Sequence, residues 1–80
     1  MAKITGQVVK GPFAVGSKNE HEAIFLSTKR GRYVLRRPGE HGFDDPVLQK
    51  LVGRTLRCRG EIDGYLFLLS DWTELKAEEP

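Results

Sequence analysis

Basic side chains are concentrated in the middle of the chain, between residues 29 and 59. This stretch has nine lysines and arginines against three acidic residues, a net charge of +6, whereas residues 60–80 carry a net charge of −5. The whole chain of 80 residues has a net charge of only +2. A local excess of positive charge attracts polyanions even when the total charge is small. Arginines that only keep strand faces soluble would give the same pattern, so both interpretations stay open.

An aromatic residue lies next to the start of this basic stretch. Cations pair with phosphates, and an aromatic ring that stacks on a nucleic-acid base contributes about 1–3 kcal/mol. Such binding weakens as salt rises, because it releases counterions from the phosphates. The residues expected to bind nucleic acid in this way are Phe25, Lys29, Arg30, Arg32 and Arg36. The alternative is that Phe25 packs under the first long loop or forms a dimer contact.

A second group of residues has the composition of a protein-binding surface. Exposed tryptophan and arginine side chains are enriched at the energetic centres of protein interfaces. The residues of this second candidate are Arg57, Arg59, Leu68 and Trp72. A second copy of the chain or another protein would bury their apolar surface. Alternatively, the first loop or the C-terminal tail covers Leu68 and Trp72.

Neither catalysis nor metal binding has support in the residue spacing. His21, His41 and Cys58 lie far apart, with no CxxC or HxxxH spacing. The chain has no nucleophile elbow and no phosphate-binding glycine-rich loop. The adjacent Asp44 and Asp45 are better explained as helix capping than as an acid–base pair. We therefore expect a binding module with no catalytic site, no metal and no cofactor.

The elements that position these residues are five strands and one helix. Alternating apolar residues and turn signals predict strands over residues 3–10, 22–28, 32–37, 54–62 and 65–72, with Gly11-Pro12 interrupting the first. A loop of even length ending at Gly31 joins the second and third strands. That register puts Ile24, Leu26, Tyr33 and Leu35 on the inner face and Phe25, Arg32, Val34 and Arg36 on the outer face. The alternative is a bulge at Gly31, which would shift the register by one residue and turn Phe25 inward.

The last hairpin has the strongest turn signal, Asp63-Gly64. Pairing outward from a loop of those two residues puts Ile62 opposite Tyr65, Gly60 opposite Phe67 and Cys58 opposite Leu69, all on the inner face. The outer face then carries Arg57 and Arg59 beside Leu66, Leu68 and Trp72.

The helix signals lie between the third and fourth strands. Asp45 has the residue type of an N-cap, Pro46 suits the first helical position, and Gly53 suits the end of the helix. Val47, Leu48, Leu51 and Val52 give the helix an apolar face. A helix this short is unstable alone, so we expect it to pack against the sheet.

This order of elements resembles the OB-fold over roughly residues 3–75, most clearly in the stretch 45–60, where a capped helix runs through Gly53 into a basic strand. It is similar to small bacterial proteins of that architecture. The resemblance implies an all-β fold, a five-stranded Greek-key barrel with a helix between strands 3 and 4. OB-folds bind oligonucleotides and oligosaccharides on strands 2 and 3, between the loops that flank them. An SH3-like barrel is the alternative.

The remaining expectations concern organisation, location and partners. Eighty residues make one domain with one core, over residues 1–75, followed by a flexible tail over residues 76–80. Cys58 is the one cysteine, and the first residues lack the pattern of a secretory signal, so we expect a cytoplasmic protein. The expected partner is single-stranded DNA or RNA. The alternative partner is a protein or a second copy, and we expect no membrane contact.

Overall fold

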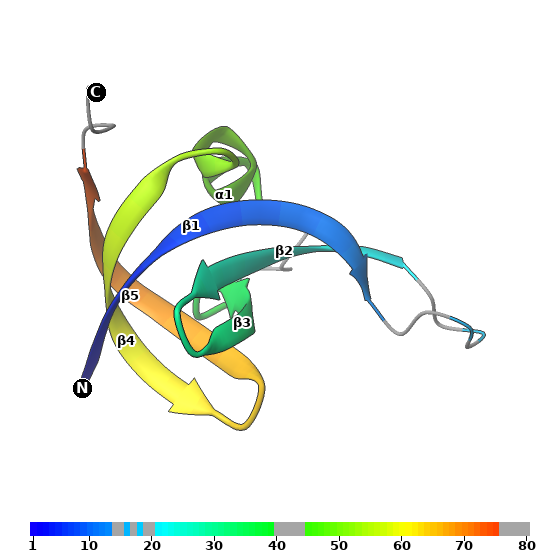
Figure 1. Cartoon of the computed structure of the whole chain (residues 1–80), viewed down its shortest axis with the longest axis horizontal. Helices are drawn as coiled ribbons and strands as arrows, with labels where there is room; N and C mark the ends of the chain where they lie inside the picture. Colours follow the sequence, from blue (N-terminus) through cyan, green and yellow to red (C-terminus); the bar gives the residue numbers. More distant parts are fainter. Residues whose placement is uncertain (14–15, 17, 19–20, 40–44, 76–80) are drawn as a thin grey trace.

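The computed structural model describes residues 1–13, 16, 18, 21–39 and 45–75, and these form five strands and one short helix (Figure 1). The elements are β1 (Ala2–Phe13), β2 (His21–Thr28), β3 (Gly31–Arg36), α1 (Pro46–Leu51), β4 (Thr55–Asp63) and β5 (Leu66–Leu75). The expected all-β class, with one short helix between the third and fourth strands, is confirmed. The tail expected at residues 76–80 lies outside the described residues, as do His41 and Asp44. Within the described ranges, no helix is long and apolar enough to cross a membrane.

The five strands form one sheet that closes on itself. They are hydrogen bonded in the order β1-β2-β3-β5-β4, and β4 pairs back onto β1 to make a closed barrel. The β3–β5 pair is parallel and the other pairs are antiparallel. Figure 1 shows β1 as a long curved strand. Its first half pairs with β4 and its second half with β2, with Gln7 in both pairings.

The first strand is longer than expected, because Gly11-Pro12 does not interrupt it. Pro12 pairs with Glu22, and β1 continues to Phe13 opposite His21. Val8 still exchanges backbone hydrogen bonds with Gly53 and Arg54, and beyond Val8 the described strand pairs with β2 on one side, so Pro12 lies in an edge. Proline is tolerated in edge strands, where its missing N–H removes no hydrogen bond from a central ladder.

The core lies inside the barrel, and the inner face predicted for β2 and β3 is confirmed. Ile24, Leu26 and Leu35 are buried, and Tyr33 is half-buried with its ring 6.4 Å from that of Phe67. Leu26 pairs with Tyr33, as the predicted loop of even length requires. The remaining buried members of this core are Val8, Leu48, Leu56, Cys58, Phe67 and Leu69.

The turn of the last hairpin lies one residue later than predicted. Asp63 pairs with Leu66, so the loop residues are Gly64 and Tyr65 rather than Asp63 and Gly64. Gly64 has a φ of +61°, which glycine adopts readily at the first position of a two-residue loop. The predicted pairs are therefore wrong. The observed pairs are Ile62 with Phe67, Gly60 with Leu69 and Cys58 with Trp72.

Two residues predicted on the inner face of this hairpin lie at the surface instead. Ile62 is 43% exposed and Tyr65 is 64% exposed. Moving the loop by one residue shifts each pair by two positions, which keeps the alternation of the two faces. Gly60, Phe67 and Leu69 are therefore still buried, as predicted.

A β-bulge changes the face on which the tryptophan lies. The register of β4 and β5 shifts between Arg59 and Gly60, where Ser70 is the extra residue of β5. A shift of one residue exchanges the two faces of a strand. Trp72 consequently lies opposite Cys58 and packs, half-buried, against the core. The prediction that Trp72 lies on the outer face is wrong.

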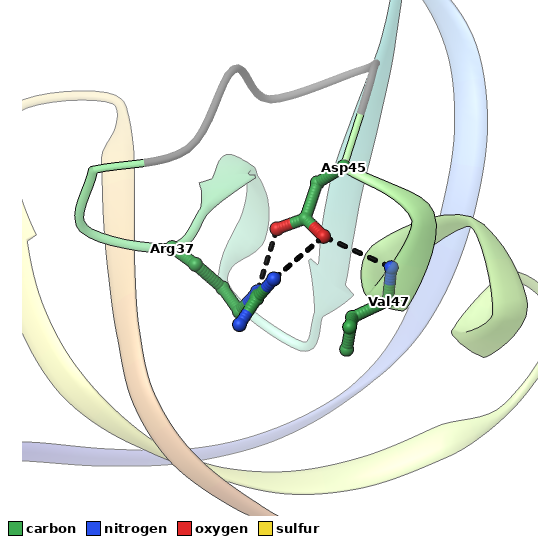
Figure 2. A network of polar contacts seen from close by, with 3 residues as sticks. All are labelled: Arg37, Asp45 and Val47. Carbon is green, nitrogen blue, oxygen red and sulfur yellow. Dashed lines mark hydrogen bonds and ion pairs between the residues drawn. The ribbon is translucent and has the colours of Figure 1, made fainter.

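An ion pair joins the start of the helix to Arg37, the residue that follows β3. Asp45 is the N-cap, as predicted, and its carboxylate accepts a hydrogen bond of 2.9 Å from the N–H of Val47 (Figure 2). The guanidinium of Arg37 donates two more hydrogen bonds to this carboxylate, at 2.6 and 2.8 Å. This pairing stabilises a carboxylate that is only 1% exposed. The apolar face of α1 places Leu48 in the core.

Candidate nucleic-acid interface

The outer face of the barrel has a continuous apolar row across four strands. Val9 of β1, Phe25 of β2, Val34 of β3 and Leu66 of β5 are direct neighbours in register. Phe25 is buried, and the other three residues of the row are half-buried. Because strands alternate their faces, this row lies on the opposite side of the sheet from the core residues Val8, Leu26, Leu35 and Phe67.

Three further aromatic rings, those of Phe13, His21 and Tyr65, lie beside this row. Phe13 lies between the other two. The ring of Phe13 stacks on that of Tyr65, with centroids 5.6 Å apart and an interplanar angle of 28°. It also lies 5.5 Å from the ring of His21 and 6.3 Å from that of Phe25. These residues come from the end of β1, the start of β2 and the β4–β5 turn. The fold therefore collects rings that are far apart in the sequence into one cluster, here called the aromatic cluster.

A cation lies directly over one of these rings. The guanidinium carbon of Arg32 is 4.7 Å from the ring centroid of Phe25, a cation–π geometry. Gly11 lies beneath both groups: a Cβ there would be 3.6 Å from an Arg32 nitrogen and 3.7 Å from the Phe25 ring. Arg32 thus reaches from β3 across β2 toward β1.

Phe25 itself lies on the outer face as predicted, but it is only 6% exposed. The surrounding Phe13, Arg32 and Val34 leave little of its ring open to a ligand. It forms the floor of the aromatic cluster. Tyr65 is 64% exposed, so solvent reaches its ring far more freely than that of Phe25. Phe13 is half-buried.

The basic residues predicted for this interface divide into two groups. Arg32 and Arg36 are exposed on the outer face of β3, and Arg36 pairs in register with Leu68 of β5. Lys29 and Arg30 form the tip of the β2–β3 hairpin, where they line a separate hollow. The five predicted residues are therefore not one surface.

The residues of the second candidate surface do not all share a face either. Arg57 and Arg59 are exposed on β4, and Leu68 is half-buried on the outer face of β5, opposite Glu61. Trp72 is turned toward the core by the β-bulge. Without Trp72, this surface lacks the large aromatic side chain on which the prediction of a protein-binding site depends.

Cys58 is a buried thiol of low reactivity. Burial raises the pKa of the Cys58 thiol to about 11, so at neutral pH it stays protonated and poorly nucleophilic. Hydrogen bonds from Arg37 hold the pKa of Asp45 below its usual range, although burial opposes this shift. Within the residues that the structure describes, no three His, Cys, Asp or Glu side chains lie close enough together to hold a metal ion.

Sequence reasoning missed Phe13, the central ring of the aromatic cluster. The pair Gly11-Pro12 predicts the end of the first strand, and this prediction places Phe13 in a loop. The alternation of Val9, Gly11 and Phe13 on one face was the signal that could have found it.

Comparison of the chain with models of known protein families, with curated proteins and with solved structures finds no match.

Proposed function

We propose that the chain is an OB-fold barrel that binds single-stranded nucleic acid on the outer face of β1, β2, β3 and β5. The observation that carries the proposal is the stacked pair of Phe13 and Tyr65 next to Phe25, whose ring lies under the guanidinium of Arg32. OB-folds bind oligonucleotides on this part of the barrel, between the loops that follow β1 and β4. The barrel order β1-β2-β3-β5-β4 and the helix between β3 and β4 support the fold assignment.

The chemistry of the surface suits a flexible polyanion with flat bases. Tyr65 offers a ring on which a base stacks, and Phe13 holds that ring in place from behind. Arg32 and Arg36 lie four residues apart on the same face of β3, where their guanidinium groups pair with two phosphates of the bound strand. Stacking on any base has a similar strength, so we expect weak sequence preference.

A matched pair of double variants tests this proposal. Arg32→Ala with Arg36→Ala removes two cations from the proposed interface, and Arg57→Ala with Arg59→Ala removes two from the outer face of β4. Fluorescence anisotropy of labelled single-stranded DNA and RNA is measured with each protein across a range of salt concentrations. Counterion release predicts that the first variant lowers the log–log salt slope by about 1.4, which corresponds to two phosphate contacts on single strands.

The control variant should leave affinity and salt slope close to those of the wild-type protein. Equal losses from both variants would mean that binding follows total charge rather than this surface, and would contradict the proposal. So would an absence of binding at low salt. The solution mass of the same samples checks the alternative function, self-association, which predicts a mass that rises with concentration.

A further inference from the structure

A hollow with a different character lies between the β2–β3 turn, the start of β1 and the end of β4. It has a volume of about 530 Å³, within the range of small-molecule sites. In Figure 1 these segments lie in the lower half of the view, away from α1. The hollow shares no residue with the aromatic cluster. Its lining residues are Lys3, Ile4, Thr5, Thr28, Lys29, Arg30, Tyr33 and Ile62.

The hollow has a basic rim and an apolar floor. Lys3, Lys29 and Arg30 are exposed cations, and the residues described along its lining include no Asp or Glu. Ile4 and Tyr33 are half-buried, and Tyr33 is held from the core side by its contact with Phe67. A site with cations on one side and a flat apolar wall on the other suits a ligand that has both an anionic and an aromatic part.

The positive charge of the hollow comes from its own rim rather than from the neighbouring strand. Lys3 of β1 lies directly opposite Arg59 of β4 in register, and Arg59 in turn lies opposite Asp71 of β5. Lys3, Lys29 and Arg30 are therefore the cations available to an anion in the hollow.

The turn that carries two of the cations is held in one conformation before any ligand binds. The hydroxyl of Thr28 donates a hydrogen bond of 2.8 Å to the carbonyl oxygen of Gly31 and accepts one of 3.1 Å from the N–H of Arg30. Gly31 has a φ of +124°, which a residue with a side chain rarely adopts. A fixed loop loses less entropy on binding than a flexible one, so the backbone that carries Lys29 and Arg30 is preorganised for a ligand.

We propose that this hollow binds a nucleoside monophosphate unit, with its phosphate between Lys3, Lys29 and Arg30 and its base against Tyr33. The unit is either a free nucleotide or the phosphorylated end of a strand, since both present the same chemistry. The proposal does not depend on the oligonucleotide interface, because the two sites have no residue in common.

The test is chemical-shift mapping of ¹⁵N-labelled protein with AMP, adenosine and inorganic phosphate, each added separately. AMP should cause saturable shifts at the amides of residues 3–5, 28–30 and 33. Adenosine and phosphate should each bind at least ten-fold more weakly, because each has only half of the recognised chemistry. Shifts of equal strength from phosphate alone would overturn the proposal, as would no shifts at millimolar AMP, or AMP shifts centred on Phe13 and Tyr65.

Crossed variants keep the two sites distinguishable. Lys29→Ala with Arg30→Ala should weaken AMP binding at least ten-fold, and Arg32→Ala with Arg36→Ala should leave it unchanged. The reverse result would overturn the proposal, as would equal losses from both variants. Lys3→Gln gives a second, single variant, and Trp72 fluorescence checks that each protein is folded. A short 5′-phosphorylated oligonucleotide shows which form of the ligand the hollow prefers. Tighter binding than AMP at the same amides indicates that the ligand is the phosphorylated end of a strand. Weaker binding than AMP indicates that the ligand is a free nucleotide.

Discussion

Phe13 stacks on Tyr65 at a centroid distance of 5.6 Å, and this contact joins the far end of β1 to the turn between β4 and β5. These are the segments that border the two flanking loops of the proposed interface. Neither ring belongs to the buried core, although Phe13 is half-covered. Removing the Tyr65 ring should therefore affect ligand binding more than folding, which makes the proposed function separable from stability.

The ion pair of Asp45 with Arg37 should make an acid-sensitive contribution to stability. Hydrogen bonds from Arg37 lower the pKa of Asp45 in the folded protein. This contribution is complete above the ordinary carboxyl pKa, near 3.9, and is lost as pH falls through the lowered folded value. Asp45→Asn should cost about 1.5–3 kcal/mol at pH 7 and progressively less below pH 4, as measured by urea unfolding.

The control for this prediction is Glu74→Gln. Glu74 pairs with Arg54 at 2.9 Å, but both side chains are well exposed, at 47% and 61%. Solvent screening makes such a pair worth less than about 1 kcal/mol. If the two variants destabilise the protein equally, the special role given to the buried carboxylate is wrong.

Burial of Cys58 should make the protein lose stability at alkaline pH. Below the ordinary thiol pKa, near 8.5, the folded and unfolded states both keep the proton. Above it the unfolded chain releases the proton, whereas the folded thiol keeps it until about pH 11. The free energy of unfolding should therefore fall by about 1.4 kcal/mol per pH unit in this window from this group alone. Urea unfolding between pH 8 and 10.5, followed by Trp72 fluorescence, measures it.

The comparison protein is Cys58→Ala, which lacks the thiol but keeps every tyrosine and lysine. Its stability should decline less steeply with pH than that of the wild type. Parallel curves for the two proteins would show that the thiol is not the group responsible.

The bulge at Gly60 should be intolerant of any side chain. A Cβ at this position would collide with the carbonyl oxygen of Leu68 and lie 3.0 Å from the ring of Phe67. Gly60→Ala should destabilise the protein by about 1–3 kcal/mol or more, because backbone must move to admit the methyl group. Gly11→Ala is the control, since its Cβ would make only ordinary contacts at 3.6 Å and beyond. Thermal unfolding of both variants gives the comparison.

The β2–β3 hairpin and the helix could be predicted from the sequence because their signals are local. Gly31 and an even loop length determine which faces Ile24 and Phe25 occupy. Asp45 followed by Pro46 marks the start of the helix without reference to the rest of the chain. Arg37 as the partner of Asp45 was not predicted, since nothing local connects the two residues.

The register of the β4–β5 hairpin and the aromatic cluster could not be predicted from local sequence signals. Asp63-Gly64 signals a turn, but does not say whether Gly64 is the first or the second loop residue. The extra Ser70 has no sequence signature, so the inward position of Trp72 depends on tertiary pairing. Phe13 reaches Tyr65 across the pairing of β1, β2, β3 and β5, which joins segments far apart in the sequence.

Binding of a labelled single-stranded oligonucleotide to Phe13→Ala, Tyr65→Ala and the double variant tests the proposed interface most directly. Loss of stacking should weaken the affinity about 5- to 150-fold for Tyr65→Ala, from about 1–3 kcal/mol per base, and leave the salt slope unchanged. The double variant should lose less than the product of the single effects, because the two rings support each other. An affinity equal to that of the wild type in folded Tyr65→Ala would contradict the account.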